Sequence, residues 1–100
     1  MSSQPDTLIE LRTQIDALDS QLVELLAKRA ALTQKVGVYK SRSGLPIYAP
    51  DREAELIAKR RQQAMEKGLP PALIEDLLRR IMRDSYQTQH QNYMCCKYLY

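Results

Sequence analysis

The sequence is 100 residues long and carries 15 Lys and Arg against 12 Asp and Glu, for a formal net charge of +3. This length allows one domain, with only a modest core if the chain stays monomeric. The mixed charge argues against a nucleic-acid-binding protein but is compatible with a local cationic pocket. Phe and Trp are absent and Gly is rare, which favours helix over sheet. We therefore expect an all-α fold.

A long helix is predicted from about Asp6 to about Arg42. Asp6 or Thr7 suits its N-cap, and Gly44 followed by Pro46 suits a left-handed cap and a stop. Apolar side chains recur along this helix every seven residues in two registers. The first register is Leu8, Ile15, Leu22, Arg29 and Val36, and the second is Leu11, Leu18, Leu25, Leu32 and Tyr39. Every member except Arg29 is apolar or aromatic, so other helices are expected to cover this stripe.

Two shorter helices follow in the prediction. The second begins at Pro50 and closes at Gly68, and the third begins at Pro70–Pro71 and reaches about Gln91. The buried face of the third helix is predicted to consist of Ile74, Leu77, Leu78, Ile81 and Met82, and to continue into Ser85 and Gln89 at helical spacing. We assign residues 1–92 to one domain and residues 93–100 to a tail of unknown structure.

The length of the first helix argues for a second copy of the chain. A helix of some 37 residues is about 55 Å long, whereas a compact domain of this size has a radius of gyration of about 13 Å. Because the other two predicted helices are each about half as long, they cannot cover the whole apolar stripe. A homodimer built on paired long helices would cover it.

Arg29 interrupts the apolar stripe. An uncompensated guanidinium there would cost several kcal/mol, so either its head reaches water beside a packed stem or it meets an anion. Lys40 follows 11 residues later, within about 20° of the same helix face, so both heads could converge on a small anion. Arg12 lies 17 residues before Arg29, about 25 Å along the axis. It could join that site only from an antiparallel partner.

Other polar residues can be interpreted either as structural or as part of a site. Ser85 and Gln89 could be a solvated helix end or hydrogen-bonding groups at the end of a pocket. Arg52 and Glu53 fall in the first turn of the second helix, where Glu53 favours the helix dipole in any case. The basic runs Lys59–Arg61 and Arg79–Arg80 are interpreted as solvated helix faces, with no nucleic-acid role.

Motifs for other chemistries are absent from the sequence. No cluster has metal-ligand spacing, and there is no GxSxG sequence or glycine-rich phosphate loop. No apolar run is long enough to span a membrane or to serve as a signal peptide. The adjacent Cys95 and Cys96 do not form a disulfide framework, so a reducing cytoplasm is the expected location.

Taken in order, these residues resemble the all-helical chorismate mutases. The resemblance spans about residues 6–91, and its matching segments are Leu11–Arg12, Ile15–Asp16, Leu25–Arg29, Val36–Lys40, Asp51–Glu53 and Asp84–Gln89. Within the family, Gly44–Tyr48 and Leu77–Arg83 look most like the mutase domain of bifunctional chorismate mutase–prephenate dehydrogenases. Fusion to a dehydrogenase domain in a full-length protein is therefore an expectation.

The resemblance implies that chorismate is rearranged to prephenate, a step toward phenylalanine and tyrosine, with no metal, cofactor or covalent intermediate. It also implies an intertwined homodimer with two sites, each completed by the partner chain. Arg12 of one chain and Arg29 of the other would hold the two substrate carboxylates through planar, bidentate contacts. Lys40 and Gln89 would donate hydrogen bonds to the ether oxygen, where negative charge develops.

The remaining site roles also follow from the resemblance. Glu53 would accept a hydrogen bond from the ring hydroxyl and orient Lys40, while Arg52 and Ser85 would border the site. Some family members have an acid four residues before Glu53, where this chain has Ala49, so hydroxyl recognition would rest more heavily on Glu53. Because Gln89 is a neutral amide, activity should be nearly flat around neutral pH.

Two rival functions stay open at this point. An isochorismate pyruvate-lyase on the same scaffold uses a similar set of arginines and lysine. A non-catalytic helical dimerisation or effector-binding module would retain the leucine stripe, but it would not need Arg29, Lys40 and Gln89 together.

Overall fold

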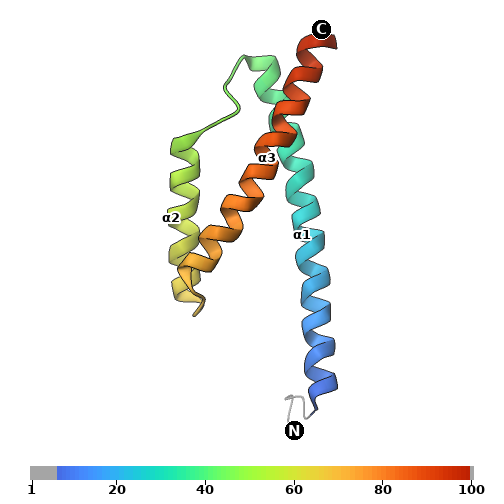
Figure 1. Ribbon diagram of the computed structural model, residues 1–100, viewed down its shortest axis with the longest axis vertical. Helices are drawn as coiled ribbons and strands as arrows, with labels where there is room; N and C mark the ends of the chain where they lie inside the picture. Colours follow the sequence, from blue (N-terminus) through green and yellow to red (C-terminus); the bar gives the residue numbers. More distant parts are fainter. Residues whose placement is uncertain (1–6, 100) are drawn as a thin grey trace. The chain divides into compact units, whose positions relative to one another are not determined.

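The computed structural model describes residues 7–99, with the side chains of residues 7–87 and of Gln89. It contains three helices, α1 (Leu8–Ser43), α2 (Pro50–Glu66) and α3 (Pro71–Leu99), and no strand within the described range (Figure 1). The predicted all-α class and the order of one long helix followed by two shorter ones are confirmed.

The third helix is longer than predicted. It was expected to end near Gln91, but α3 continues to Leu99 and has 29 residues. No Gly or Pro follows Pro71 in the sequence, so nothing in the chain breaks the helix. Cys95 and Cys96 therefore belong to the backbone of α3, while their side chains lie outside the described ones. The length argument for a dimer also weakens, because α2 with 17 residues is about half of α1 but α3 is not.

The ends of α1 form where the local sequence favours them. Thr7 Oγ1 accepts a hydrogen bond from the Glu10 N–H at 3.1 Å, which makes Thr7 the N-cap; Asp6 lies outside the described residues. At the other end Gly44 has φ +68°, and the Leu45 N–H donates to the Lys40 carbonyl at 2.9 Å. This Schellman arrangement confirms the left-handed cap predicted at Gly44.

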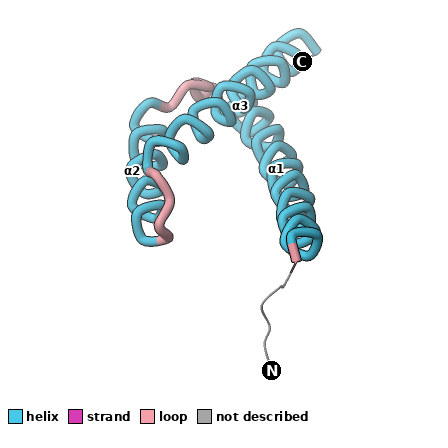
Figure 2. The backbone as a smooth tube through the Cα atoms, turned by 60° about the horizontal axis from the view of Figure 1, so that its bottom comes forward, coloured by secondary structure: helices cyan, strands magenta, loops and turns pink. Residues whose placement is uncertain are grey.

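The turn between α2 and α3 has the same construction. Gly68 has φ +75°, and the Leu69 N–H donates to the Ala64 carbonyl at 2.8 Å. Pro71 then opens α3, as Pro50 opens α2, because a proline at the first helical position has no N–H to leave unpaired. Figure 2 shows this turn and the loop between α1 and α2 as the two connections that join the three helices.

The chain divides into two compact units, the first ending at Leu32 and the second beginning at Thr33. In the first unit, the apolar stripe of α1 is open to solvent. Its large side chains are between 45% and 62% exposed, and they are Leu8, Leu11, Ile15, Leu18, Leu22, Leu25 and Leu32. A contiguous apolar surface of this length marks an interaction site.

The second unit contains the C-terminal part of α1 together with α2 and α3. Few of its described side chains are buried: Ile57 and Ala64 from α2, Met82 and Gln89 from α3, and Thr33 from α1. Ile74, Leu78 and Ile81 are half-buried, in line with the predicted face of the third helix. Leu77 was also predicted to be buried, but it is 43% exposed because it lines an open groove that is described below.

Gly37 allows α1 and α3 to approach each other within this unit. A Cβ atom built on Gly37 would lie 2.9 Å from the Cα and 3.2 Å from the Cβ of Gln89. Real Cβ atoms essentially never come that close to a backbone atom. The sequence therefore needs glycine at this position, although glycine costs up to about 1 kcal/mol relative to alanine in a helix interior.

We predict that Gly37→Ala destabilises the protein and displaces Gln89. The alanine would gain about 1 kcal/mol of helix propensity, but overpacking against a backbone costs about 1–3 kcal/mol, so the clash should dominate. Thermal unfolding should show a lowered midpoint, and the NMR signals of the Gln89 side-chain amide should shift.

Gly68→Ala is the matched control, because a Cβ there meets nothing within 4 Å but sits at a positive φ. It should lower stability through backbone strain alone and leave the Gln89 amide signals unchanged. A Gly37→Ala protein as stable as the parent, with the same Gln89 signals, would contradict the close approach.

Candidate functional site

The ammonium group of Lys40 is held by two acceptors at the end of α1. Lys40 Nζ donates to the Ile47 carbonyl at 2.6 Å and to Gln89 Oε1 at 2.9 Å. Burial lowers the pKa of Lys40 below its ordinary value of 10.5. A lysine ammonium has three N–H donors, so one donor is left for a ligand.

Gln89 meets Lys40 from α3. Its side chain is only 5% exposed, and the residue is placed there by the close approach of its backbone to Gly37. Because Oε1 accepts from Lys40, the amide is fixed with its carbonyl toward the ammonium and its NH₂ group directed away. The pair therefore presents hydrogen-bond donors from two helices, which suits an oxygen that carries or develops negative charge.

The loop between α1 and α2 is tied to α3 by two aromatic rings. Tyr48 and Tyr86 pack edge to face, with centroids 5.6 Å apart and an interplanar angle of 76°, a favourable geometry for aromatic pairs. Burial raises the pKa of the Tyr86 hydroxyl above its ordinary value of 10, and the negative charge of Glu53 adds to this rise, whereas a hydrogen bond with the Ala49 backbone opposes it. Tyr86 therefore stays protonated at neutral pH and can act as a donor.

Glu53 lies in the first turn of α2 and faces α3. Its side chain is 18% exposed, and its Oε1 accepts a hydrogen bond from Arg79 Nη1 at 3.1 Å. Arg79 also contacts Glu75 Oε2 through Nε at 2.9 Å and through Nη2 at 2.8 Å. Glu75 Oε1 in turn accepts from Arg61 Nη1 at 2.8 Å. The hydrogen bond from Arg79 is the largest cause that lowers the pKa of Glu75.

The structure brings together some of the predicted site residues and not others. Lys40 and Gln89 are in direct contact. Glu53 was expected to orient Lys40. Its side chain contacts Arg79 and the Tyr86 hydroxyl, and the orienting contacts of Lys40 come from Ile47 and Gln89. Glu53 lies on α2 opposite α3, which places Arg79 rather than Lys40 within its reach.

The other predicted site residues differ in their exposure and in the unit to which they belong. Ser85 is half-buried on the same face of α3 as Gln89, and its hydroxyl donates to the Ile81 carbonyl at 3.0 Å. Arg52 is exposed at the start of α2. Arg12 is exposed and Arg29 half-buried, both on the part of α1 that belongs to the first unit. Their position relative to Lys40 stays a prediction.

Four features of the site were missed from the sequence: Gly37, the Ile47 carbonyl, Arg79 and Tyr86. Arg79 had been interpreted as part of a solvated helix face, and only its spacing of four residues from Glu75 could have indicated an ion pair. Arg79 and Arg61 are 50% and 42% exposed, in line with that interpretation, but each also forms an ion pair between α2 and α3 that was not predicted. Contacts between helices leave no signal in a single sequence.

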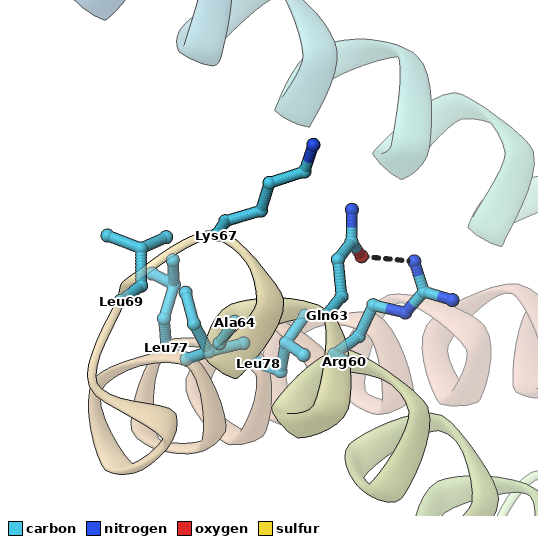
Figure 3. Close-up of a pocket in the computed structure, with 8 residues that line it drawn as sticks. Arg60, Gln63, Ala64, Lys67, Leu69, Leu77 and Leu78 are labelled. Atoms are coloured by element: carbon cyan, nitrogen blue, oxygen red, sulfur yellow. Dashed lines mark hydrogen bonds between the residues drawn. The ribbon is translucent and has the colours of Figure 1, made fainter.

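An open groove lies elsewhere on the second unit, between the end of α2 and the start of α3. It has a volume of about 260 Å³ and is lined by Arg60, Gln63, Ala64, Lys67, Leu69, Ile74, Leu77 and Leu78. Figure 3 shows leucine side chains along its floor, while Lys67 and the hydrogen-bonded pair of Arg60 and Gln63 rise beside it. Leu78 precedes Gln89 by 11 residues, about 16 Å along α3, so this apolar groove is separate from the Lys40–Gln89 pair.

Two features are absent from the described part of the chain. Within residues 7–99, no described group of three or more His, Cys, Asp or Glu side chains could hold a metal ion. No described helix is long and apolar enough to cross a membrane.

Comparisons with known proteins agree on one family. The model of the family chorismate mutase type II matches residues 11–90. The T-protein of Enterobacter agglomerans is 55% identical over 83% of this chain and 22% of its own length. The bifunctional chorismate mutase/prephenate dehydratase of Escherichia coli K12 is 37% identical over 82% of this chain and 21% of its own. The chain thus spans about a fifth of the length of these two relatives.

A third relative has a different printed substrate. The 4-amino-4-deoxychorismate mutase of Streptomyces pristinaespiralis is 27% identical over 86% of this chain and 67% of its own length.

We predict that the Lys40 ammonium titrates below pH 10.5, because burial disfavours its charged form. Since the folded state then binds this proton less tightly than the unfolded state, the group favours folding more as pH rises between the folded pKa and 10.5. NMR titration of the Lys40 Nζ resonance measures the shift directly. A Lys40 ammonium that titrates at its ordinary pKa would contradict its burial.

Proposed function

This chain belongs to the chorismate mutase type II family, and we propose that it rearranges chorismate to prephenate. The observation that carries the proposal is the contact between Lys40 Nζ and buried Gln89 Oε1 at 2.9 Å. It leaves donors from both residues for one oxygen of a ligand. In this rearrangement the ether C–O bond breaks while a C–C bond forms within the same molecule, so no external reactant is required.

Lys40 and Gln89 would act on the ether oxygen of chorismate. Negative charge grows on this oxygen as the C–O bond breaks, so donors that are already oriented stabilise the transition state more than the substrate. Lys40 is oriented in advance by the Ile47 carbonyl, and Gln89 by Lys40 itself. Neither group therefore needs to reorganise during the reaction.

The two carboxylates of chorismate would be held by arginines from two chains. We propose that Arg29 of one chain and Arg12 of its partner bind them, and that this clamp places the enolpyruvyl arm over the ring. Restricting a flexible substrate to its reactive shape supplies a large part of the rate in unimolecular reactions. Arg52 and Ser85 would border this pocket, and Glu53 would accept the hydrogen bond from the ring hydroxyl.

The clamp requires an intertwined homodimer. The exposed apolar stripe of α1 supports this proposal, since a leucine surface repeating every seven residues is suited to pairing with another helix. The groove between α2 and α3 (Figure 3) offers a further apolar surface in the second unit. The small number of buried side chains among those described in the second unit also favours a partner that adds to the core.

We propose further that residues 1–92 form the mutase domain of a cytoplasmic protein in phenylalanine and tyrosine biosynthesis. The match of the family model to residues 11–90 supports the domain. The relatives that continue well beyond the matched region support a fusion to a second domain, for which a prephenate dehydrogenase is the proposal.

The direct test incubates the protein with chorismate and follows ultraviolet absorbance and product, with mass measured by size exclusion on the same sample. We expect prephenate and the mass of a dimer. Pyruvate formed only from isochorismate would favour the lyase instead.

Arg29→Ala should lower turnover about a hundredfold or more, because a substrate carboxylate loses its charged partner, while the dimer persists. The neighbouring variant Lys28→Ala should leave turnover unchanged, and a protein with no turnover at all would favour a non-catalytic module.

The role of Gln89 is tested by Gln89→Glu. A glutamate must be protonated to donate a hydrogen bond, and the nearby Lys40 ammonium favours its charged form. Activity of the variant should therefore appear only under acidic conditions, whereas the parent should be nearly flat around neutral pH. Gln89→Leu, which can never donate, should be weak at every pH. A Glu variant that is equally active at neutral and acidic pH would remove the proposed role at the ether oxygen.

A further inference from the structure

Arg79 contacts two glutamates through its guanidinium group. Three of its nitrogens are engaged: Nε and Nη2 contact Glu75 Oε2, and Nη1 contacts Glu53 Oε1. Glu75 is itself fixed from α2 by Arg61. The four side chains form an alternating line of charges that begins at Arg61 and ends at Glu53.

The two ends of the Arg79–Glu53 contact differ in exposure. Arg79 is 50% exposed and Glu53 only 18%, so the contact is worth little as a surface ion pair but acts on a carboxylate that is largely shielded from water. A carboxylate can accept about four hydrogen bonds, so Arg79 does not prevent Glu53 from binding a ligand. Together with the Tyr86 hydroxyl, which also hydrogen-bonds Glu53, Arg79 fixes the direction in which the carboxylate points, and it offsets part of the carboxylate's charge.

We propose that Arg79 is a positioning residue for Glu53 and makes the site selective for a neutral hydroxyl over a cationic group on the substrate ring. This inference rests on the proposed function, in which Glu53 accepts from the ring hydroxyl of chorismate. A carboxylate without a cationic neighbour would attract an ammonium at the same ring position more strongly than a hydroxyl. A guanidinium 3.1 Å from Glu53 Oε1 repels that ammonium and leaves the hydrogen bond to a hydroxyl intact.

The two substrates that separate these cases are chorismate and 4-amino-4-deoxychorismate, which carries an amino group in place of the ring hydroxyl. Their kcat/KM values would be measured for the parent chain and for Arg79→Ala and Arg79→Gln. Arg79→Ala should lower kcat/KM for chorismate about tenfold, chiefly through KM, and affect the amino compound less. The ratio of the two kcat/KM values should thus shift toward the amino compound, by up to about tenfold.

Arg80→Ala is the matched control, since Arg80 is the next residue on α3 and pairs with exposed Asp84. Neither substrate should change by more than about twofold in that variant. In a Glu53→Gln background, removal of Arg79 should no longer shift the ratio, because the charge on which it acts is gone.

The outcomes separate this inference from the proposed function. A parent protein that rearranges neither compound overturns the proposed function and this inference with it. A parent that rearranges chorismate, with Arg79→Ala behaving like Arg80→Ala, overturns only the role of Arg79. If Arg79→Ala lowers kcat/KM equally for both substrates and also lowers the unfolding midpoint, Arg79 has only a structural role and the inference is overturned. A parent protein that prefers the amino compound would overturn the proposed selectivity.

Discussion

The close approach of two helix backbones at Gly37 and Gln89 is the constraint on which the rest of the candidate site depends. It leaves no room for a Cβ atom at position 37 of α1. It also brings the side-chain amide of Gln89 within 2.9 Å of the Lys40 ammonium in the last turn of α1. Both groups would be costly to bury alone, and each satisfies the other in part. The Schellman cap at Gly44 then returns the chain so that the Ile47 carbonyl meets the same ammonium. One glycine contact and one helix cap therefore orient the two donors on which the proposed chemistry relies.

A second part of the site is organised by charge rather than by packing. Ala49 offers no side-chain cap at the start of α2, and Glu53 contacts an arginine and a tyrosine hydroxyl from the neighbouring helix. That arginine is fixed through Glu75, so the orientation of one carboxylate depends on ion pairs that reach across α2 and α3. In the proposed enzyme, two parts of the site would thus recognise the substrate. The ether oxygen would meet donors that are positioned by close packing of helices, and the ring hydroxyl would meet a carboxylate that is positioned mainly by ion pairs.

Features that depend on neighbours along the chain were predictable, and features that depend on contacts between helices were not. The starts at Pro50 and Pro71 and the caps at Gly44 and Gly68 follow from local backbone chemistry, and the structure confirms them. The family and the candidate roles of Lys40 and Gln89 followed from an ordered set of residues. The end of α3 was placed too early because no residue marks it. The contact of Glu53 with Arg79 was not predicted, because the pairing of α2 with α3 depends on how two helix faces rotate toward each other, which periodicity alone does not determine.

The contact between Lys40 and Gln89 has a consequence for the order in which the molecule assembles. Its residues are 49 positions apart in the chain, whereas the ion pair between Arg61 and Glu75 joins residues only 14 apart. Loop closure grows with the logarithm of length, so closing the longer loop costs about 1 kcal/mol more in chain entropy. The α2–α3 hairpin is therefore favoured to form early in folding, with α1 docking on it afterwards. In the native state, the pair that carries the proposed chemistry would belong to the structure that opens first, and amide hydrogens around it would exchange sooner than those of the hairpin.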